Sequence, residues 1–193
     1  MAKDQIRIEL KEINARIPDK EFKSGEIHAK LLNFKLFLNC KIPLLFYGKK
    51  SEVDTRPLIE HCLQTERKVF LPFVDELAIG EVNSLKELKE DKSGIFVPAH
   101  IAGKEDYQSI DLIIVPGVGF DRKGNRVGHG LGWYDKLFPI IPESVPRLAL
   151  SFADLVLTSV PADKHDEPVD FIITEHEIIN THARGNQFET RYL

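Results

Sequence analysis

The chain alternates between short runs of apolar residues and longer segments in which apolar residues recur every three to four positions. A short run bounded by turn residues predicts a buried strand, whereas the wider spacing predicts an amphipathic helix. The strongest strand is predicted at residues 110–115, which are apolar except for Asp111 and are typical of the middle of a parallel sheet. The predicted strands are residues 42–47, 69–74, 94–98, 110–115, 147–152 and 169–174.

Helical spacing predicts three amphipathic helices in the first part of the chain. The first spans residues 3–16, and the second begins near Ser24. The third opens within residues 51–60, where Asp54 or Thr55 can cap it. The expected apolar stripes are Ile6, Leu10 and Ile13 in the first helix and Ile27, Leu31, Phe34 and Leu38 in the second.

A further, strongly charged helix is predicted at residues 84–91, between two strands. Strands that alternate with helices imply a three-layer α/β/α domain around a mainly parallel sheet. The 193 residues fit one domain, which we place at residues 1–180. Residues 181–193 are expected to form a loosely ordered tail.

Composition limits the classes of partner. Lys and Arg total 26 and Asp and Glu total 30, so the net charge is −4 and no overall attraction to nucleic acid or to an anionic membrane is expected. No apolar run approaches the roughly 20 residues of a membrane span. The two cysteines, Cys40 and Cys62, lie in apolar segments and are expected to be buried and reduced. These features predict a cytoplasmic protein.

Residues 124–135 contain four glycines, and we call this segment the glycine loop. It follows the strongest predicted strand, and ligands of open α/β sheets gather beyond the carboxyl ends of the strands. The loop does not match a P-loop, because Asn125 and Arg126 stand where Lys and Ser or Thr are required. It does not match the dinucleotide-binding fingerprint either.

The alternating glycines Gly128, Gly130 and Gly132 leave backbone N–H groups unobstructed beside the start of a helix. This arrangement predicts an anion cradle, to which Arg126 can add a fixed cation. A second interpretation stays open, in which the glycines form a turn that lets the two aromatic residues after them pack inward.

Four charged residues outside these glycines are candidates for the same site. Asp135 follows the glycines and Asp170 interrupts an apolar strand, so the two can hold Mg²⁺ beside a polyphosphate or serve only structural roles. Lys3 and Arg7 share one helix face and either reach the phosphates or remain solvated. Zinc is not expected, because no histidines have H-x-x-x-H spacing.

These pieces, in this order, resemble the 5-formyltetrahydrofolate cyclo-ligase family, also called methenyltetrahydrofolate synthetase. The main match is PGVGFDRKGNRVGHGLGWYD at residues 116–135, against P-G-x-x-F-D-x-x-G-x-R-[LI]-G-x-G-x-G-[YF]-Y-D. Lys3 and Arg7 resemble an N-terminal K-x-x-x-R, residues 52–55 resemble E-[VI]-x-T, and residues 169–170 resemble a late V-D. The resemblance covers nearly the whole chain.

The resemblance implies a fold of the NagB/RpiA/CoA-transferase-like kind and a reaction that closes 5-formyltetrahydrofolate to 5,10-methenyltetrahydrofolate with ATP and Mg²⁺. The partners would be these small molecules, and we expect a monomer or a weak homodimer. Arg126 and Glu52 would act in catalysis, Glu52 by orienting the folate or by escorting a proton. The implied ATP-binding residues are Lys3, Arg7, Arg126, Gly128, His129, Gly130, Leu131, Gly132, Trp133 and Tyr134. The implied folate-binding residues are Arg7, Tyr47, Glu52, His129 and Trp133, and the implied Mg²⁺ ligands are Asp135 and Asp170.

The chain departs from the family pattern at several positions. Val127 replaces Leu or Ile, Trp133 replaces Tyr, and Val97 stands where many bacterial members have Glu before a proline. The last change leaves the role of residues 75–108 undefined. His129 occupies a variable position and is interpreted as a solvent-facing spacer with occasional phosphate contact. Two rival functions stay open: an ATP- or folate-binding relative without cyclo-ligase activity, and an isomerase or transferase that acts on a sugar phosphate or CoA ester.

Overall fold

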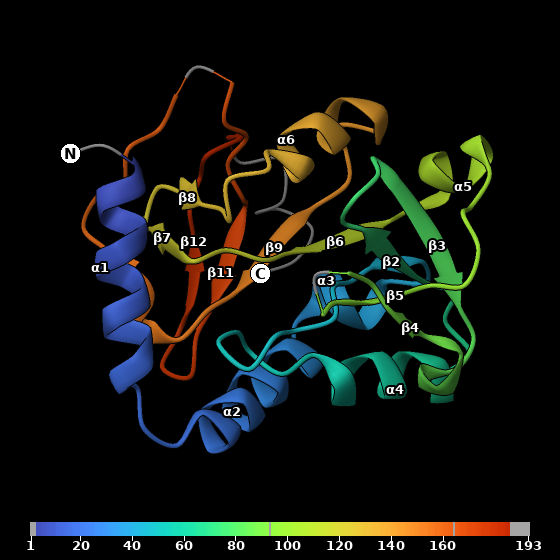
Figure 1. Ribbon diagram of the computed structural model, residues 1–193, viewed down its shortest axis with the longest axis horizontal. Coiled ribbons are helices and arrows are strands. Elements are labelled where there is room, and N and C mark those ends of the chain that lie inside the picture. Colours follow the sequence, from blue (N-terminus) through green and yellow to red (C-terminus); the bar gives the residue numbers. More distant parts are fainter. Residues whose placement is uncertain (1–2, 93, 164, 186–193) are drawn as a thin grey trace.

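The computed structural model describes residues 3–185 except residues 93 and 164, and its centre is a seven-stranded sheet (Figure 1). The strands of this sheet are β1 (Pro43–Leu44), β2 (Val69–Phe73), β3 (Ala78–Val82), β6 (Leu112–Val115), β9 (Arg147–Leu150), β11 (Phe171–Ile173) and β12 (Ile178–Asn180). Their order is β12-β11-β9-β6-β1-β2-β3. The inner strands are parallel, and the edge strands β3 and β12 are antiparallel to their neighbours. The prediction of a mainly parallel sheet is confirmed.

Helices cover both faces of this sheet. The first face carries α1 (Lys3–Arg16), α2 (Lys20–Leu32), α3 (Lys35–Asn39) and α4 (Arg56–Gln64), and the second carries α5 (Lys104–Ser109) and α6 (Trp133–Leu137). Side chains in a strand alternate between faces, so Leu112 and Ile114 of β6 pack with the first layer and Ile113 and Val115 with the second. In Figure 1, α2 and α4 lie on the opposite side of the sheet from α5 and α6. The three-layer α/β/α prediction is therefore confirmed.

Two small sheets extend the domain. Their strands are β4 (Lys89–Glu90) with β5 (Phe96–Val97), and β7 (Gly119–Asp121) with β8 (Arg126–Val127) and β10 (Val156–Leu157). Short 3₁₀ helices occur at Leu85–Glu87, Phe138–Ile140 and Ala153–Leu155. The β7–β8 hairpin lies beside α1 (Figure 1) and carries the start of the glycine loop. Asp121 organises its turn, because its buried carboxylate accepts from the backbone N–H groups of Lys123 and Asn125.

The second helix differs from the prediction at both ends. It starts before Ser24, and the chain becomes extended at Phe34, so the next helix has a new register. As a result Leu36 and Phe37 are buried, whereas Leu38, which was expected on the apolar face, is 52% exposed. The inner stripe at Ile27 and Leu31 was correctly predicted, and the prediction was wrong where it continued a single helix through Phe34.

The predicted helix at residues 84–91 is wrong. Ser84 starts a single 3₁₀ turn by accepting from the N–H of Lys86, and the chain then becomes extended as β4. This segment has no continuous apolar face that would favour a helix, and pairing with β5 satisfies its backbone instead. The pairing leaves Val97 of β5 buried.

Asp111 and the two cysteines belong to the core. The carboxylate of Asp111 accepts from the N–H groups of Lys41 and Ile42 at 2.7 and 3.0 Å and from the Cys40 thiol. Cys40 and Cys62 are buried and free, as expected. Burial raises the pKa of Cys62 to about 11 and also raises the pKa of Cys40. Both thiols are therefore protonated and unreactive near neutral pH.

The described part of the expected tail is anchored. The Thr181 hydroxyl donates to the carbonyl of Val169 at 2.6 Å, and Arg184 forms an ion pair with Asp170. Residues 186–193 lie outside the described residues, so the expectation for them stays a prediction. No helix in the described part of the chain is both long and apolar enough to cross a membrane.

Candidate functional site

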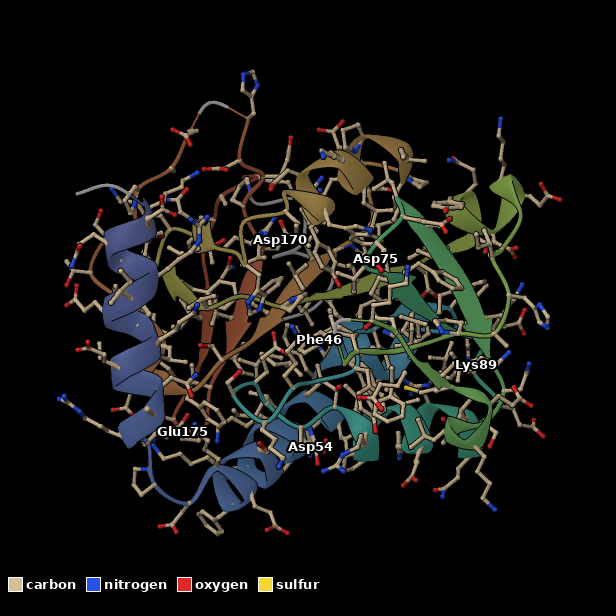
Figure 2. All side chains as sticks on the ribbon, in the orientation of Figure 1. Phe46, Asp54, Asp75, Lys89, Asp170 and Glu175 are labelled. Carbon is tan, nitrogen blue, oxygen red and sulfur yellow. The ribbon has the colours of Figure 1, made fainter. Side chains whose placement is uncertain are left out.

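A cavity of about 740 Å³ opens beyond the carboxyl ends of β1, β2 and β6. Phe46 and Tyr47 follow β1, Asp75 follows β2, and Pro116 follows β6, and all four line the cavity. Figure 2 labels Phe46 and Asp75, which come from these two neighbouring strands. The cavity therefore lies beyond the carboxyl ends of the strands, the edge of the sheet at which the sequence predicts the site.

The cavity brings together all but one of the predicted site residues. Those that line it are Lys3, Arg7, Tyr47, Glu52, Arg126, Gly128, His129, Gly130, Leu131, Gly132, Trp133, Tyr134 and Asp135. They come from α1, the β1–α4 connection, β8, the glycine loop and α6. Residues far apart in the sequence thus form one continuous wall.

The glycines of the loop have two different roles. At Gly124 a Cβ atom would lie 2.3 Å from the carbonyl oxygen of Val169, so this glycine permits close packing against the chain that enters β11. Gly130 and Gly132 have φ values of 103° and 61° and face the cavity. Close packing therefore requires glycine at position 124, whereas the later glycines leave an open surface toward the cavity. The binding of an anion on that surface stays a prediction.

The surface of the loop is suited to an anion. The N–H groups of residues 129–131 donate to no other described residue. Gly128 lies against Arg126, since a Cβ there would be 3.0 Å from Nη1 of that arginine. The helix that follows has only five residues, so its dipole contributes less than the sequence suggested. Free amides and nearby cations make this surface attractive to phosphate oxygens.

Arg126 is the most buried cation of the site, with a side chain that is 7% exposed. Its Nη2 donates to Oδ1 of Asp135 at 2.7 Å, while its Nε is buried without a hydrogen-bond partner among the described residues. The guanidinium lies 5.7 Å from the ring centroid of Tyr134 and 5.9 Å from that of Phe138. A buried donor without a partner, on a cavity wall, indicates a place for a ligand acceptor.

Tyr134 is enclosed next to this arginine. Burial raises the pKa of its phenol well above the ordinary value, so the hydroxyl is neutral. The hydroxyl oxygen also has no hydrogen-bond partner within the described residues. Trp133 packs edge-on against Tyr134, and its Nε1 donates to the carbonyl of Glu76 at 2.7 Å. The aromatic pair thus fixes the base of the loop and ties it to the β2–β3 turn.

Lys3 and Arg7 extend from α1 into the cavity. The Lys3 ammonium bonds to Asp166 and Asp163, the latter at 2.7 Å. Burial alone would lower the pKa of Lys3, but these hydrogen bonds outweigh it and raise the pKa. Burial would raise the pKa of Asp166, yet bonds from the Asp163 N–H and from Lys3 hold it below its ordinary value. Arg7 donates through Nε to the carbonyl of Gly128 at 2.8 Å and so supports the loop from behind.

The other end of the cavity combines a carboxylate with aromatic rings. Glu52, whose side chain is 10% exposed, lies 2.9 Å from Nε2 of His129 and accepts from the N–H of Lys49 at 2.9 Å. The rings of Tyr47 and Phe96 lie 4.8 Å apart at an angle of 35°. His129 is exposed, as predicted for a solvent-facing residue, and it is also paired with a carboxylate. A flat heterocycle can stack against these rings while its N–H groups face Glu52.

The structure separates the two predicted Mg²⁺ ligands. Asp135 lines the cavity, and its second carboxylate oxygen has no hydrogen bond to the described residues. Asp170 does not line the cavity. It is 4% exposed at the amino end of β11, where Arg184 and the N–H of Arg147 bind its carboxylate. Figure 2 shows Asp170 and Glu175 at opposite ends of this strand. The charge beside this apolar strand therefore has a structural partner in Arg184, and a role of Asp170 in holding Mg²⁺ stays a prediction.

Several cavity residues were missed by the sequence reasoning. Asp163 and Asp166 come from a loop that carries no recognisable motif, and Lys49 adjoins Glu52. Phe96 lies within a predicted strand, so only its role was missed. Residues 75–108, whose role was undefined, supply an apolar wall through Ile95 and Phe96, whereas Val97 points into the core and is not a lining residue.

The fold and the cavity define an α/β domain in which a glycine loop with free backbone amides faces a compartment with aromatic walls. Residues 1–175 match the 5-formyltetrahydrofolate cyclo-ligase family, and the chain belongs to that family. Its members are ligases by name, which agrees with the resemblance carried by residues 116–135.

Individual relatives agree with this membership over nearly their full length. The solved structure of Aquifex aeolicus 5,10-methenyltetrahydrofolate synthetase has 28% identity and a TM-score of 0.80, with 94% of this chain and 93% of that chain covered. The mouse 5-formyltetrahydrofolate cyclo-ligase is 27% identical over 90% of this chain and 94% of its own. A probable 5-formyltetrahydrofolate cyclo-ligase of Caenorhabditis elegans is 25% identical over 92% of this chain and 94% of its own.

Proposed function

We propose that the protein closes 5-formyltetrahydrofolate to 5,10-methenyltetrahydrofolate and converts ATP to ADP and phosphate. The observation that carries this proposal is the union of two compartments in one cavity. One holds the free amides of the glycine loop with Arg126 and Lys3, and the other holds Glu52 beside the rings of Tyr47 and Phe96. A nucleotide in the first and a reduced pterin in the second would meet at the glycine loop.

The chemistry requires such a union, because the oxygen of a formamide is a poor leaving group. Transfer of the γ-phosphoryl group to that oxygen turns it into phosphate, which can depart when N10 attacks the carbon. Phosphoryl transfer needs positioning and charge neutralisation more than covalent help from the protein. In this proposal the loop amides, Arg126 and Lys3 would neutralise the phosphates, and Glu52 would orient the folate.

Mg²⁺ would be held by few protein atoms. No group of three His, Cys, Asp or Glu side chains in the described part of the chain is arranged as a metal site. A magnesium ion bound to a nucleotide needs only one or two carboxylates, with phosphate and water oxygens completing its shell. Asp135 fits that role, since one of its oxygens is free and it lies beside Arg126. The ion, when bound, would neutralise charge on the transferred phosphoryl group.

An absorbance assay tests the function. Methenyltetrahydrofolate absorbs in the near ultraviolet where 5-formyltetrahydrofolate does not, so the protein with ATP, MgCl₂ and 5-formyltetrahydrofolate should produce a rising signal. We expect no rise when ATP is omitted. Absence of a signal from folded protein that still binds ATP in calorimetry would contradict the proposal and favour a binding protein without cyclo-ligase activity.

The contacts of Lys3 lead to a prediction for nucleotide binding. Asp166 holds the Lys3 ammonium, so a triphosphate must compete with this carboxylate. We expect Asp166→Asn to lower the Kd for ATP several-fold, as suits a partly exposed ion pair that contributes up to about 1 kcal/mol. Isothermal titration calorimetry measures the change. Asp154→Asn is the matched control, because Asp154 pairs with Lys23 outside the cavity. Weaker binding by the Asp166 variant would show that this carboxylate supports the ligand.

A further inference from the structure

His129 is held in one orientation by a carboxylate. Its Nε2 lies 2.9 Å from Oε1 of Glu52, while Oε2 of Glu52 accepts from the N–H of Lys49. An ionised carboxylate can only accept, so the ring N–H belongs on Nε2. Nδ1 then carries a lone pair, and it has no hydrogen bond to any described residue. This is the arrangement by which a carboxylate orients a histidine base.

His129 also stands at the junction of the two compartments. It lies between Gly128 and Gly130 on the glycine loop, and its partner Glu52 belongs to the compartment proposed to hold the folate. Its side chain is 40% exposed, and it lines the cavity, so solvent can exchange a proton with the ring. No other histidine in the described part of the chain lines this cavity.

We propose that His129 is the base that accepts the proton lost on ring closure, with Glu52 as its orienting partner. This inference rests on the proposed function. After phosphorylation of the formyl oxygen, the lone pair of N10 forms the bond to the formyl carbon. The proton leaves N10 for Nδ1 of His129, the C–O bond breaks, and phosphate departs with that electron pair. The imidazolium then returns its proton to solvent.

The chemistry of N10 explains why a base is useful. N10 is an arylamine and a weak nucleophile, and positive charge develops on it as the new bond forms. A positioned base that removes the proton in this step typically accelerates it by about 10²–10⁴-fold. Glu52 stabilises the imidazolium that results. The rival acceptors are water and the departing phosphate itself.

Single-turnover kinetics of His129→Gln tests the inference. Glutamine keeps a polar side chain but cannot accept the proton. We expect the variant to form ADP in the first turnover at nearly the wild-type rate, whereas methenyltetrahydrofolate appears at least 100-fold more slowly. Added imidazole should restore part of the rate to His129→Ala. His100→Gln is the control, because His100 is exposed outside the cavity and should behave as wild type.

Each result decides the inference. Unchanged methenyltetrahydrofolate formation by His129→Gln would assign the proton to water or phosphate. Equal loss of ADP formation and ring closure, without rescue by imidazole, would assign His129 to nucleotide binding or to the fold. Circular dichroism shows whether His129→Gln or His129→Ala fails to fold. If only the glutamine variant fails, rescue of the folded alanine variant by imidazole still decides whether His129 is the base. Failure of the proposed function is distinguishable, because the wild-type protein itself would then form no methenyltetrahydrofolate.

Discussion

Replacing Arg126 with alanine should lower kcat/KM by about 150-fold. Its guanidinium is buried on the cavity wall, where Nη2 pairs with Asp135 and Nε is left without a partner among the described residues, so Nε is available to a phosphate oxygen. Charge-assisted hydrogen bonds contribute roughly 1.5–3 kcal/mol each, and a loss of about 3 kcal/mol corresponds to this decrease in rate. The absorbance assay measures the effect, and calorimetry with ATP separates binding from turnover.

A control on the same hairpin makes this result specific. Arg122 is exposed and pairs with Glu177, so Arg122→Ala should leave kcat/KM unchanged. Arg126→Lys keeps the charge but loses the planar set of donors, so its kcat/KM should lie between those of the wild type and of Arg126→Ala. Wild-type kinetics in Arg126→Ala would remove this arginine from the site.

Replacing Asp170 with asparagine should lower the free energy of unfolding by about 3 kcal/mol, because the substitution breaks a buried ion pair. The partner in that pair is Arg184, whose side chain is 11% exposed and which keeps its hydrogen bonds to the carbonyls of Glu143 and Val145. Urea denaturation measures the change. The Mg²⁺ concentration required for half-maximal activity should stay the same, since Asp170 lies outside the cavity.

Asp135→Asn is the matched comparison for this variant. Asp135 lines the cavity and retains a free oxygen, so its replacement should raise the Mg²⁺ requirement. Its effect on unfolding should be smaller, because its side chain is 23% exposed. If Asp170→Asn instead raised the Mg²⁺ requirement and kept its stability, Asp170 would belong to the metal site.

The sequence predicted those elements whose apolar pattern is set by the core. β2, β6, β9 and β11 are buried, so their runs are continuous and easily recognised. The edge strands β3 and β12 were missed, because their residues are mixed and pairing with a neighbour decides their conformation. The same long-range pairing made residues 84–91 a turn and a strand instead of a helix.

The site was predictable where a motif is local. The lining residues of the glycine loop are consecutive in the sequence, so one motif predicts them together. Lys3, Arg7 and Glu52 were predicted because short motifs contain them. Asp163 and Asp166 depend on how a loop without a motif folds over α1, which no local pattern shows. The position of Asp170 outside the cavity was not predictable for a similar reason. Its partner Arg184 lies in a segment that the sequence predicts to be a loose tail.

The tight approach at Gly124 has a consequence for attempts to broaden the substrate range. The carbonyl of Val169 leaves no volume for a side chain there, and only one residue separates this turn from Arg126. A larger residue would push the hairpin outward and shift the arginine, although position 124 is not on the cavity wall. Mutant libraries that diversify His129 or Leu131 should therefore keep this codon invariant.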